Sequence, residues 1–291
     1  MCPSMQHSFP SGFRGFTTNV GLKQEGDDFL AVVSSVPARS AALFTRSRFA
    51  GPSVILSRAS PRACSNRGVV VLAGNANVAT GYAGTEHAAE VRARVARMAG
   101  MSANELMICS TGVIGRPYPM DDIRRSLDGL RWPASVPALD TAAAAIMTGD
   151  ARPKSIHVRC GDATLVGIAK GGGVVEHDRA TILAFFFTDA AVSPIELERL
   201  FRGVMEGAFS ALNVAVDTAT SDTAAVFANG LAGPVAWSDF ERAFEEGARQ
   251  LVWQIARENE VADERLAGGG DGVRSLRNGG TLLEENPIDA A

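Results

Sequence analysis

The sequence has few histidines and cysteines, and their placement excludes several kinds of active site. Four histidines occur in 291 residues, and the G-x-S-x-G turn that presents a catalytic serine is absent. The four cysteines are widely spaced and form no CxxC pair. We therefore expect neither a serine-hydrolase triad nor a metal site, and we expect reduced thiols in a cytoplasmic protein.

Clustered positive charge and long apolar runs are also lacking. The net charge is −4, and the 28 lysines and arginines are scattered, which counts against a nucleic-acid surface. The longest apolar run, residues 182–187, has the length of a strand and not of a membrane span. Residues 1–10 show no secretory signal. With 46% hydrophobic and 21% charged residues, the composition is that of a globular protein with one or two domains.

Apolar periodicity predicts a mixed α/β chain in which strands and helices alternate without a regular βαβ unit. Residues 1–11 are expected to form a flexible terminus, and the glycine-rich end at 265–291 a disordered tail. Strands are expected at 29–34, 41–45, 68–73, 105–110, 155–159, 164–169, 182–191 and 221–228. Helices are expected at 85–99, 120–130, 139–147, 193–212 and 237–257, the fourth with Ser193 at its N-cap and Pro194 at N1.

One threonine stands at the junction between a glycine-rich loop and a dense apolar run. Glycines at 171–173 precede a short polar stretch, then Ala180, Thr181 and the run at 182–187. A threonine hydroxyl becomes a good nucleophile when the residue begins a chain, because its own α-amino group serves as the base. Self-cleavage before Thr181 would create such a terminus. The alternative is that Thr181 is an ordinary β-branched residue at the start of a strand.

This segment resembles the autoprocessing site of the ornithine acetyltransferase family. The family pattern is Lys-Gly-x-Gly-Met-x-x-Pro-x-Met-Ala-Thr-Met-Leu. The chain departs from it at Val174, His177 and Arg179, where the family has Met, Pro and Met. The positions that match are Lys170, Gly171, Gly173, Ala180, Thr181 and Leu183.

Further motifs extend the resemblance from about Gly12 to about Glu260. Residues 110–115, Ser-Thr-Gly-Val-Ile-Gly, are similar to the family's oxyanion-hole segment without a departure. Residues 145–154 are similar to Ala-Ile-Met-Thr-Thr-Asp-Thr-x-Pro-Lys, with Gly149 and Ala151 replacing two threonines. Residues 44–53, 74–81 and 221–230 fit as well, and the first of these looks most like the family members of clavulanic acid biosynthesis.

The resemblance implies a fold and a division of the chain. The fold is an α/β (α+β) four-layer αββα sandwich of the ornithine acetyltransferase and DmpA-like type. Residues 12–180 would form the N-terminal segment with the oxyanion hole. Residues 181–264 would begin the second segment with the threonine nucleophile, and 265–291 would be the tail.

The resemblance also implies a reaction. After cleavage between Ala180 and Thr181, acetyl would pass from N-acetylornithine to glutamate through an acetyl-threonine. Thr111 and Gly112 would stabilise the oxyanion, and Thr148, Lys170, Thr181 and Glu260 would contact substrate. The implied partners are these small molecules and an oligomer of cleaved chains, with no cofactor, nucleic acid or membrane. Cys109, which precedes the oxyanion segment, is expected to be an apolar core filler.

One comparison with the family points the other way. Family members continue into a C-terminal lobe that adds an Asn and a Thr to the substrate site, and we expect that lobe to be missing here. Residues 259–264 keep Glu260 but lack the glycines and lysine that flank it in the family. The alternative is therefore a truncated, catalytically impaired relative that acts as a folded remnant or interaction partner. We expect such a chain to be aggregation-prone, because bared apolar surface and sheet edges favour association.

Overall fold

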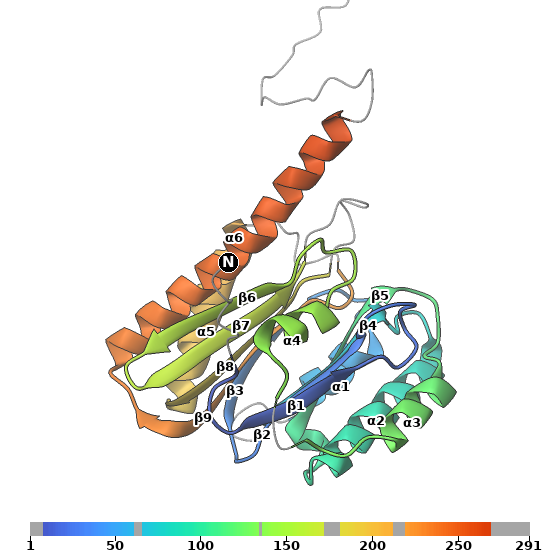
Figure 1. Cartoon of the computed structure of the whole chain (residues 1–291), viewed down its shortest axis with the longest axis horizontal. Helices are drawn as coiled ribbons and strands as arrows, with labels where there is room; N and C mark the ends of the chain where they lie inside the picture. Colours follow the sequence, from blue (N-terminus) through green and yellow to red (C-terminus); the bar gives the residue numbers. More distant parts are fainter. Residues whose placement is uncertain (1–7, 61–65, 134–135, 172–180, 212–218, 269–291) are drawn as a thin grey trace, which may run out of the picture.

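The computed structural model describes residues 8–60, 66–133, 136–171, 181–211 and 219–268, with side chains throughout except at 208–211 and 258–268. Within these residues the strands form two sheets, shown in Figure 1. The first sheet has the order β1 (Phe13–Thr18), β2 (Phe29–Ser34), β4 (Gly68–Asn75) and β5 (Leu106–Val113). The second has the order β3 (Arg39–Phe44), β9 (Thr223–Pro234), β8 (Leu183–Ala191), β7 (Ala163–Lys170) and β6 (Lys154–Cys160).

The helices of the described residues cover the outer faces of these sheets or close their edge. A short 3₁₀ turn at Ala103–Glu105 leads into β5. The α-helices are α1 (Pro52–Ala59), α2 (Gly81–Met98), α3 (Met120–Asp128), α4 (Leu139–Ala145), α5 (Pro194–Ala211) and α6 (Trp237–Gly268).

Both sheets are buried on two faces, which gives the protein four layers. One apolar core lies between the sheets, where β2, β4 and β5 face β7, β8 and β9. A second core joins the outer face of the first sheet to α2 and α3. A third joins the outer face of the second sheet to α5 and α6. The order helix, sheet, sheet, helix confirms the predicted αββα sandwich.

Strand β8 shows why the longest apolar run of the sequence is a strand. Successive side chains of a strand point to opposite faces. Phe185 and Phe187 therefore enter the core between the sheets, and Phe186 packs on Phe244 of α6 with ring centroids 4.9 Å apart. A strand buried on both faces carries apolar residues without alternation.

The alanine-rich helix α4 closes one edge of the space between the sheets. It contacts β1 and β2 of the first sheet and β6 and β7 of the second. Leu139, Ala142 and Ala143 are buried in the core between them. Small side chains let the helix approach both sheets, as the sequence predicts for this segment.

Two parallel strand pairs correct the expectation that no βαβ unit is present. Strand β4 pairs with β5 in parallel, with α2 between them in sequence. Strand β8 likewise pairs with β9 in parallel across α5. A parallel pair needs a long crossover, which is usually a helix. The sequence did not predict these βαβ units, because turn-rich residues at the strand ends interrupt the alternation of strand and helix.

The two ends of the described chain also differ from expectation. Residues 8–11 contact the rest of the fold: Phe9 lies edge-on to Phe187, with centroids 5.1 Å apart, and Ser11 N donates to Asp189 at 3.1 Å. Helix α6 continues to Gly268, beyond the predicted end at 257 and past position 265, where the tail was expected. The predictions for residues 1–7 and 269–291 lie outside the described residues. Strand β1 and helix α1 were not predicted.

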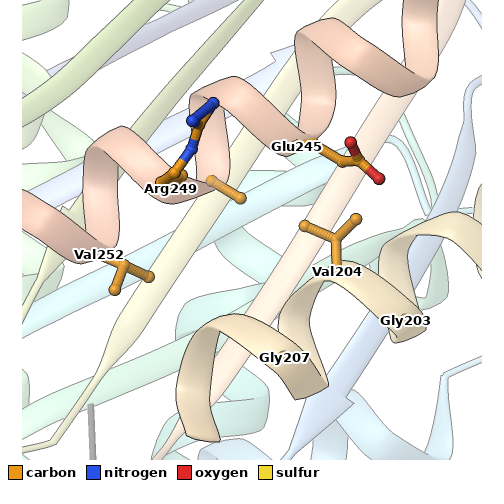
Figure 2. Close-up of a pocket in the computed structure, with 7 residues that line it drawn as sticks. Gly203, Val204, Gly207, Glu245, Arg249 and Val252 are labelled. Carbon is orange, nitrogen blue, oxygen red and sulfur yellow. The ribbon is translucent and has the colours of Figure 1, made fainter. Parts of the chain in front are cut away.

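A groove runs along the outer helical layer between α5 and α6 (Figure 2). Gly203, Val204 and Gly207 line one side, and Glu245, Arg249 and Val252 line the other. None of the site residues predicted from the sequence lines it. Within the described residues, no helix has the length and apolar character that crossing a membrane requires.

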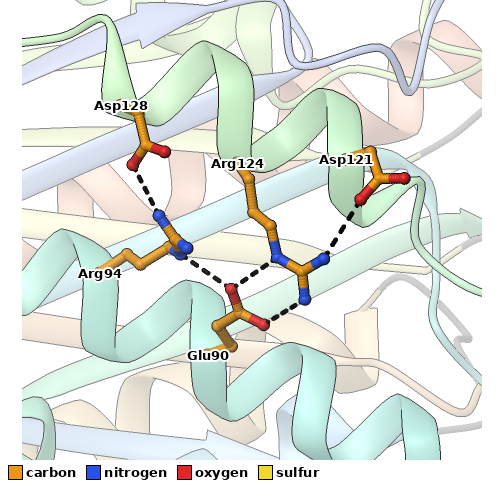
Figure 3. Close-up of polar contacts among 5 residues, drawn as sticks. All are labelled: Glu90, Arg94, Asp121, Arg124 and Asp128. Atoms are coloured by element: carbon orange, nitrogen blue, oxygen red, sulfur yellow. Dashed lines mark hydrogen bonds and ion pairs between the residues drawn. The ribbon is translucent and has the colours of Figure 1, made fainter.

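An ion-pair network ties α2 to α3 (Figure 3). Arg124 Nη2 donates to Glu90 Oε2 at 2.7 Å, and Arg94 Nε donates to Glu90 Oε1 at 2.8 Å. Arg94 reaches Asp128 at 2.6 Å, and Arg124 reaches Asp121 at 3.2 Å. The hydrogen bond from Arg124 is the main reason that the pKa of Glu90 falls to about 2.

We predict that Glu90→Gln lowers the free energy of unfolding by up to about 1 kcal/mol at pH 7, because partly exposed ion pairs are screened by water. A lowered folded-state pKa contributes stability above the unfolded value, and this contribution is lost as pH falls. The difference from wild type should therefore shrink between the ordinary glutamate pKa of 4.5 and about 2. Urea denaturation across this range measures it. Glu86→Gln, an exposed carboxylate on the same helix, is the control, and an equal effect there would contradict the prediction.

Candidate active site

Thr181 lies just ahead of β8 and is half-buried. Its carbonyl oxygen accepts a hydrogen bond from Lys170 Nζ at 3.1 Å. The adjacent Ile182 N donates to Asp222 Oδ1 at 2.8 Å, and Ile182 O accepts from Thr223 N at 3.1 Å. Thr181 is thus followed directly by a fixed backbone. Ala180, on the other side of the predicted cut, lies outside the described residues.

Thr111 lies at the end of β5 and is buried. Cys109, two residues earlier, belongs to the core between the sheets, and its side chain meets that of Thr223 at the start of β9. Because side chains alternate along a strand, Thr111 is on the same face as Cys109. It therefore faces the second sheet at the end where β8 and β9 begin. Burial raises the pKa of the Cys109 thiol to about 12, which agrees with a core filler.

Gly112 occupies a position that no other residue fits. Its φ is +123°, a conformation that side chains disfavour. A Cβ placed there would lie 2.3 Å from the carbonyl carbon of Gly74 on the paired strand β4. The close approach of these backbones explains why glycine follows Thr111, independently of any role in chemistry.

Asp150 is the centre of a buried charged group beside Thr181. Its Oδ1 accepts from Lys154 Nζ at 2.8 Å and from Gly171 N at 2.8 Å. Its Oδ2 accepts from Thr148 N at 3.1 Å and lies 3.9 Å from Lys170 Nζ. Burial alone would raise the pKa of Asp150, but Lys170 and Lys154 outweigh it and hold the pKa below its usual range. The carboxylate is therefore charged at neutral pH.

A third lysine adds to this group. Lys23 Nζ donates to Ala145 O at 3.3 Å, and Asp150 is among the charges that act on it. Burial lowers the pKa of Lys23, although Asp28 and Asp150 oppose the shift. Three lysines therefore act on the carboxylate of Asp150, and Asp28 also acts on Lys23.

The structure brings three of the predicted site residues together, namely Lys170, Thr181 and Thr148. Lys170 and Thr181 are in contact, and Thr148 joins them through its backbone bond to Asp150. The Thr148 side chain is exposed. Glu260 lies in α6, but its side chain is outside the described residues. Its predicted contact with substrate stays a prediction.

Sequence reasoning gave no role to Asp150, Lys154 or Asp222. All three stand in motifs that carry the family resemblance, at 145–154 and 221–230. Each is at most 8% exposed, and burial of charged groups on this scale needs partners. The sequence signal that could have identified them was a charged residue close to a strand predicted to be buried. Within the described residues, no group of His, Cys, Asp and Glu is placed to hold a metal ion.

A four-layer sandwich with a half-buried threonine just ahead of β8, and with a buried threonine followed by glycine near the end of β5, has the arrangement of an acyl-transfer enzyme. The sequence model of the ArgJ family matches residues 14–268. The chain belongs to the ArgJ family.

Two relatives are similar over almost the whole chain. The glutamate N-acetyltransferase Oat2 of Streptomyces clavuligerus is 50% identical over 287 residues, which are 97% of this chain and 73% of that protein. The arginine biosynthesis bifunctional protein ArgJ of Rhodococcoides fascians is 47% identical over 288 residues, which are 98% of this chain and 71% of that protein.

Two solved structures share the fold. The ArgJ protein of Bacillus halodurans aligns with a TM-score of 0.50 and 25% identity over 61% of this chain and 95% of its own. The ornithine acetyltransferase of Mycobacterium tuberculosis, solved with ornithine, aligns with a TM-score of 0.50 and 26% identity over 61% of this chain and 97% of its own.

We predict that Asp150→Ala lowers the free energy of unfolding by about 3–5 kcal/mol, because it leaves buried cations without their carboxylate. Urea denaturation at pH 7 measures the loss. Asp140→Ala is the matched control, since Asp140 is exposed and accepts one hydrogen bond from Ser155. An effect of Asp150→Ala as small as that of the control would show that the lysines do not depend on it.

Proposed function

We propose that this protein transfers acetyl from N-acetylornithine to glutamate through an acetyl ester on Thr181. The observation that carries the proposal is the half-buried Thr181 just ahead of β8, whose carbonyl oxygen accepts a hydrogen bond from Lys170. The chain is 50% identical to a glutamate N-acetyltransferase. Lys170 and Thr148 would contact substrate, with Glu260 meeting an ammonium group.

Thr181 first has to become the first residue of a chain. Its hydroxyl oxygen attacks the carbonyl carbon of Ala180, and the peptide nitrogen leaves with a proton, which gives an ester. This step already frees the α-amino group of Thr181. Water then hydrolyses the ester, which leaves a carboxylate on Ala180, frees the hydroxyl of Thr181 and separates the two pieces. The ordinary pKa of such an α-amino group is about 7.7–8.0, so a modest decrease makes it a base at neutral pH.

The freed threonine would then work in two half-reactions. The α-amino group takes the hydroxyl proton while Oγ attacks the acetyl carbonyl of N-acetylornithine, and ornithine leaves with that proton. The amine of glutamate then attacks the acetyl-threonine, and the proton that this amine loses passes to the departing Oγ. Thr111 and the Gly112 backbone would stabilise the oxyanion of each step, since a close glycine lets its N–H approach the oxygen.

The sheet order explains how a cut chain would stay together. In the second sheet, β9 and β8 belong to the piece after the cut and lie between β3 on one side and β7 on the other. Both β3 and β7 belong to the piece before the cut. The two pieces would therefore share one sheet and one core, and we propose an assembly of the two cleaved chains working in the cytoplasm.

The lengths of the solved relatives' chains support this proposal. Each aligns with 61% of this chain while at least 95% of its own chain is covered. That share is close to the share that residues 1–180 make up of this chain. The solved chains are thus about as long as the predicted first piece.

Thr181→Ala is predicted to leave a single full-length chain where the wild type gives two, because the attacking hydroxyl is lost. Intact mass and a denaturing gel distinguish the two outcomes, and size-exclusion chromatography should show the two wild-type chains eluting together. Thr188→Ala, which removes another buried threonine of β8, should still be cut. Equal cleavage of Thr181→Ala and wild type would overturn the assignment of the nucleophile.

Thr111→Ala is predicted to reduce kcat by roughly 10²–10³, with a smaller change in KM, because an oxyanion contact strengthens in the transition state. Steady-state kinetics of acetyl transfer from N-acetylornithine to glutamate measure both constants. Thr111→Ser keeps the hydroxyl and should retain most of the activity. A change confined to KM would instead make Thr111 a contact of the bound substrate.

A further inference from the structure

The peptide unit that follows Thr181 is held at both of its polar atoms. Lys170 Nζ donates to the carbonyl oxygen of Thr181 at 3.1 Å. Asp222 Oδ1 accepts from the N–H of Ile182 at 2.8 Å. The contact with Lys170 belongs to the site already described, whereas the contact with Asp222 has no role in the chemistry given above.

Asp222 is suited to a fixed position because its carboxylate is buried. The residue is 8% exposed, and Ile182 is 2% exposed. Burial raises the pKa of Asp222 to about 6, although the Ile182 N–H and the charge of Lys170 oppose the shift. The side chain has one described backbone partner, and that partner is the residue next to the proposed nucleophile.

The backbone that carries Asp222 is itself anchored from a different part of the chain. Thr45 N donates to Asp222 O at 2.8 Å, and the Thr45 hydroxyl donates to Ala219 O at 2.5 Å. Gly51 N donates to Thr220 O at 3.0 Å. Residues 219–222 are therefore tied to the segment after β3, which does not contain the nucleophile.

Such an anchor matters once the chain is cut. The first residues of a chain fray unless something holds them, and Thr181 precedes the first ladder residue of β8, Leu183. A nucleophile has to keep its geometry within a fraction of an ångström, and a displacement of about 1 Å can cost about 10²-fold in rate.

We propose that Asp222 is a positioning residue that holds Thr181 in place by accepting the N–H of Ile182. The inference rests on the function proposed above. It assigns to Asp222 the hydrogen-bond acceptor and not the charge, so an asparagine should serve in its place.

The chain offers a matched control at the opposite end of the same strand. Asp189 is 5% exposed, and its carboxylate also accepts backbone N–H bonds, from Thr164 at 2.8 Å and from Ser11 at 3.1 Å. Asp189→Ala therefore removes a similar buried contact from β8 without approaching Thr181.

The experiment compares wild type with Asp222→Ala, Asp222→Asn and Asp189→Ala. It measures the cut fraction by intact mass, the melting temperature by circular dichroism, and kcat and KM for acetyl transfer from N-acetylornithine to glutamate, with kcat expressed per cut molecule.

Asp222→Ala should be cut more slowly and lose about 10²-fold in kcat, with KM changed by no more than about twofold. Asp222→Asn should recover kcat to within about tenfold of wild type, because its amide oxygen still accepts. Asp189→Ala should lower the melting temperature but keep kcat within about twofold.

Other outcomes overturn the proposal. A wild-type kcat in Asp222→Ala, an Asp222→Asn variant no better than Asp222→Ala, or an equal loss of kcat in Asp189→Ala would each do so. If Asp222→Ala does not fold, Asp222→Leu is measured in its place. If neither variant folds while Asp189→Ala does, the contact between Asp222 and Ile182 serves the fold and not the position of the nucleophile. An uncut, inactive wild type instead defeats the proposed function, and the inference with it.

Discussion

The parallel pairing of β8 with β9 is the contact on which the rest of the structure depends. Its register places Leu183 beside Thr223, and so sets Ile182 beside Asp222. A parallel pair requires a crossover, and α5 makes it on the outer face of the second sheet. The same pairing sends Phe187 and Phe227 into the core between the sheets, with their rings stacked 5.5 Å apart. The pairing of β8 with β9 therefore positions both the candidate site and the core between the sheets.

Two buried carboxylates fix the flanks of the segment that contains the proposed cut. Asp150 accepts the N–H of Gly171 and Asp222 accepts the N–H of Ile182, each at 2.8 Å. A buried carboxylate is costly without partners, and a backbone N–H at a strand end needs an acceptor that the ladder does not supply. Each therefore satisfies the other. The lysines near Asp150 offset its charge.

The strand order of the second sheet would keep the fold stable after the proposed self-cleavage. The strands after the proposed cut lie inside the second sheet, flanked by β3 and β7 from before it. Every ladder hydrogen bond at these two borders joins one piece to the other. Breaking the peptide bond before Thr181 would remove one covalent link and leave the core intact. A new chain end could therefore form just ahead of β8 without loss of the fold.

Elements with local signals could be predicted from the sequence alone. The apolar run at 182–187 predicted β8, Ser193 and Pro194 predicted the start of α5, and the alanines at 139–147 predicted α4. The family motifs predicted Thr181, Lys170, Thr111 and Gly112. Strand β1, helix α1 and the packing of Phe9 were missed, because their stability comes from contacts with distant segments. Which backbone groups the buried carboxylates accept from followed from the three-dimensional fold, since Asp222 and Ile182 are 40 residues apart in sequence and no local pattern encodes a contact across that distance.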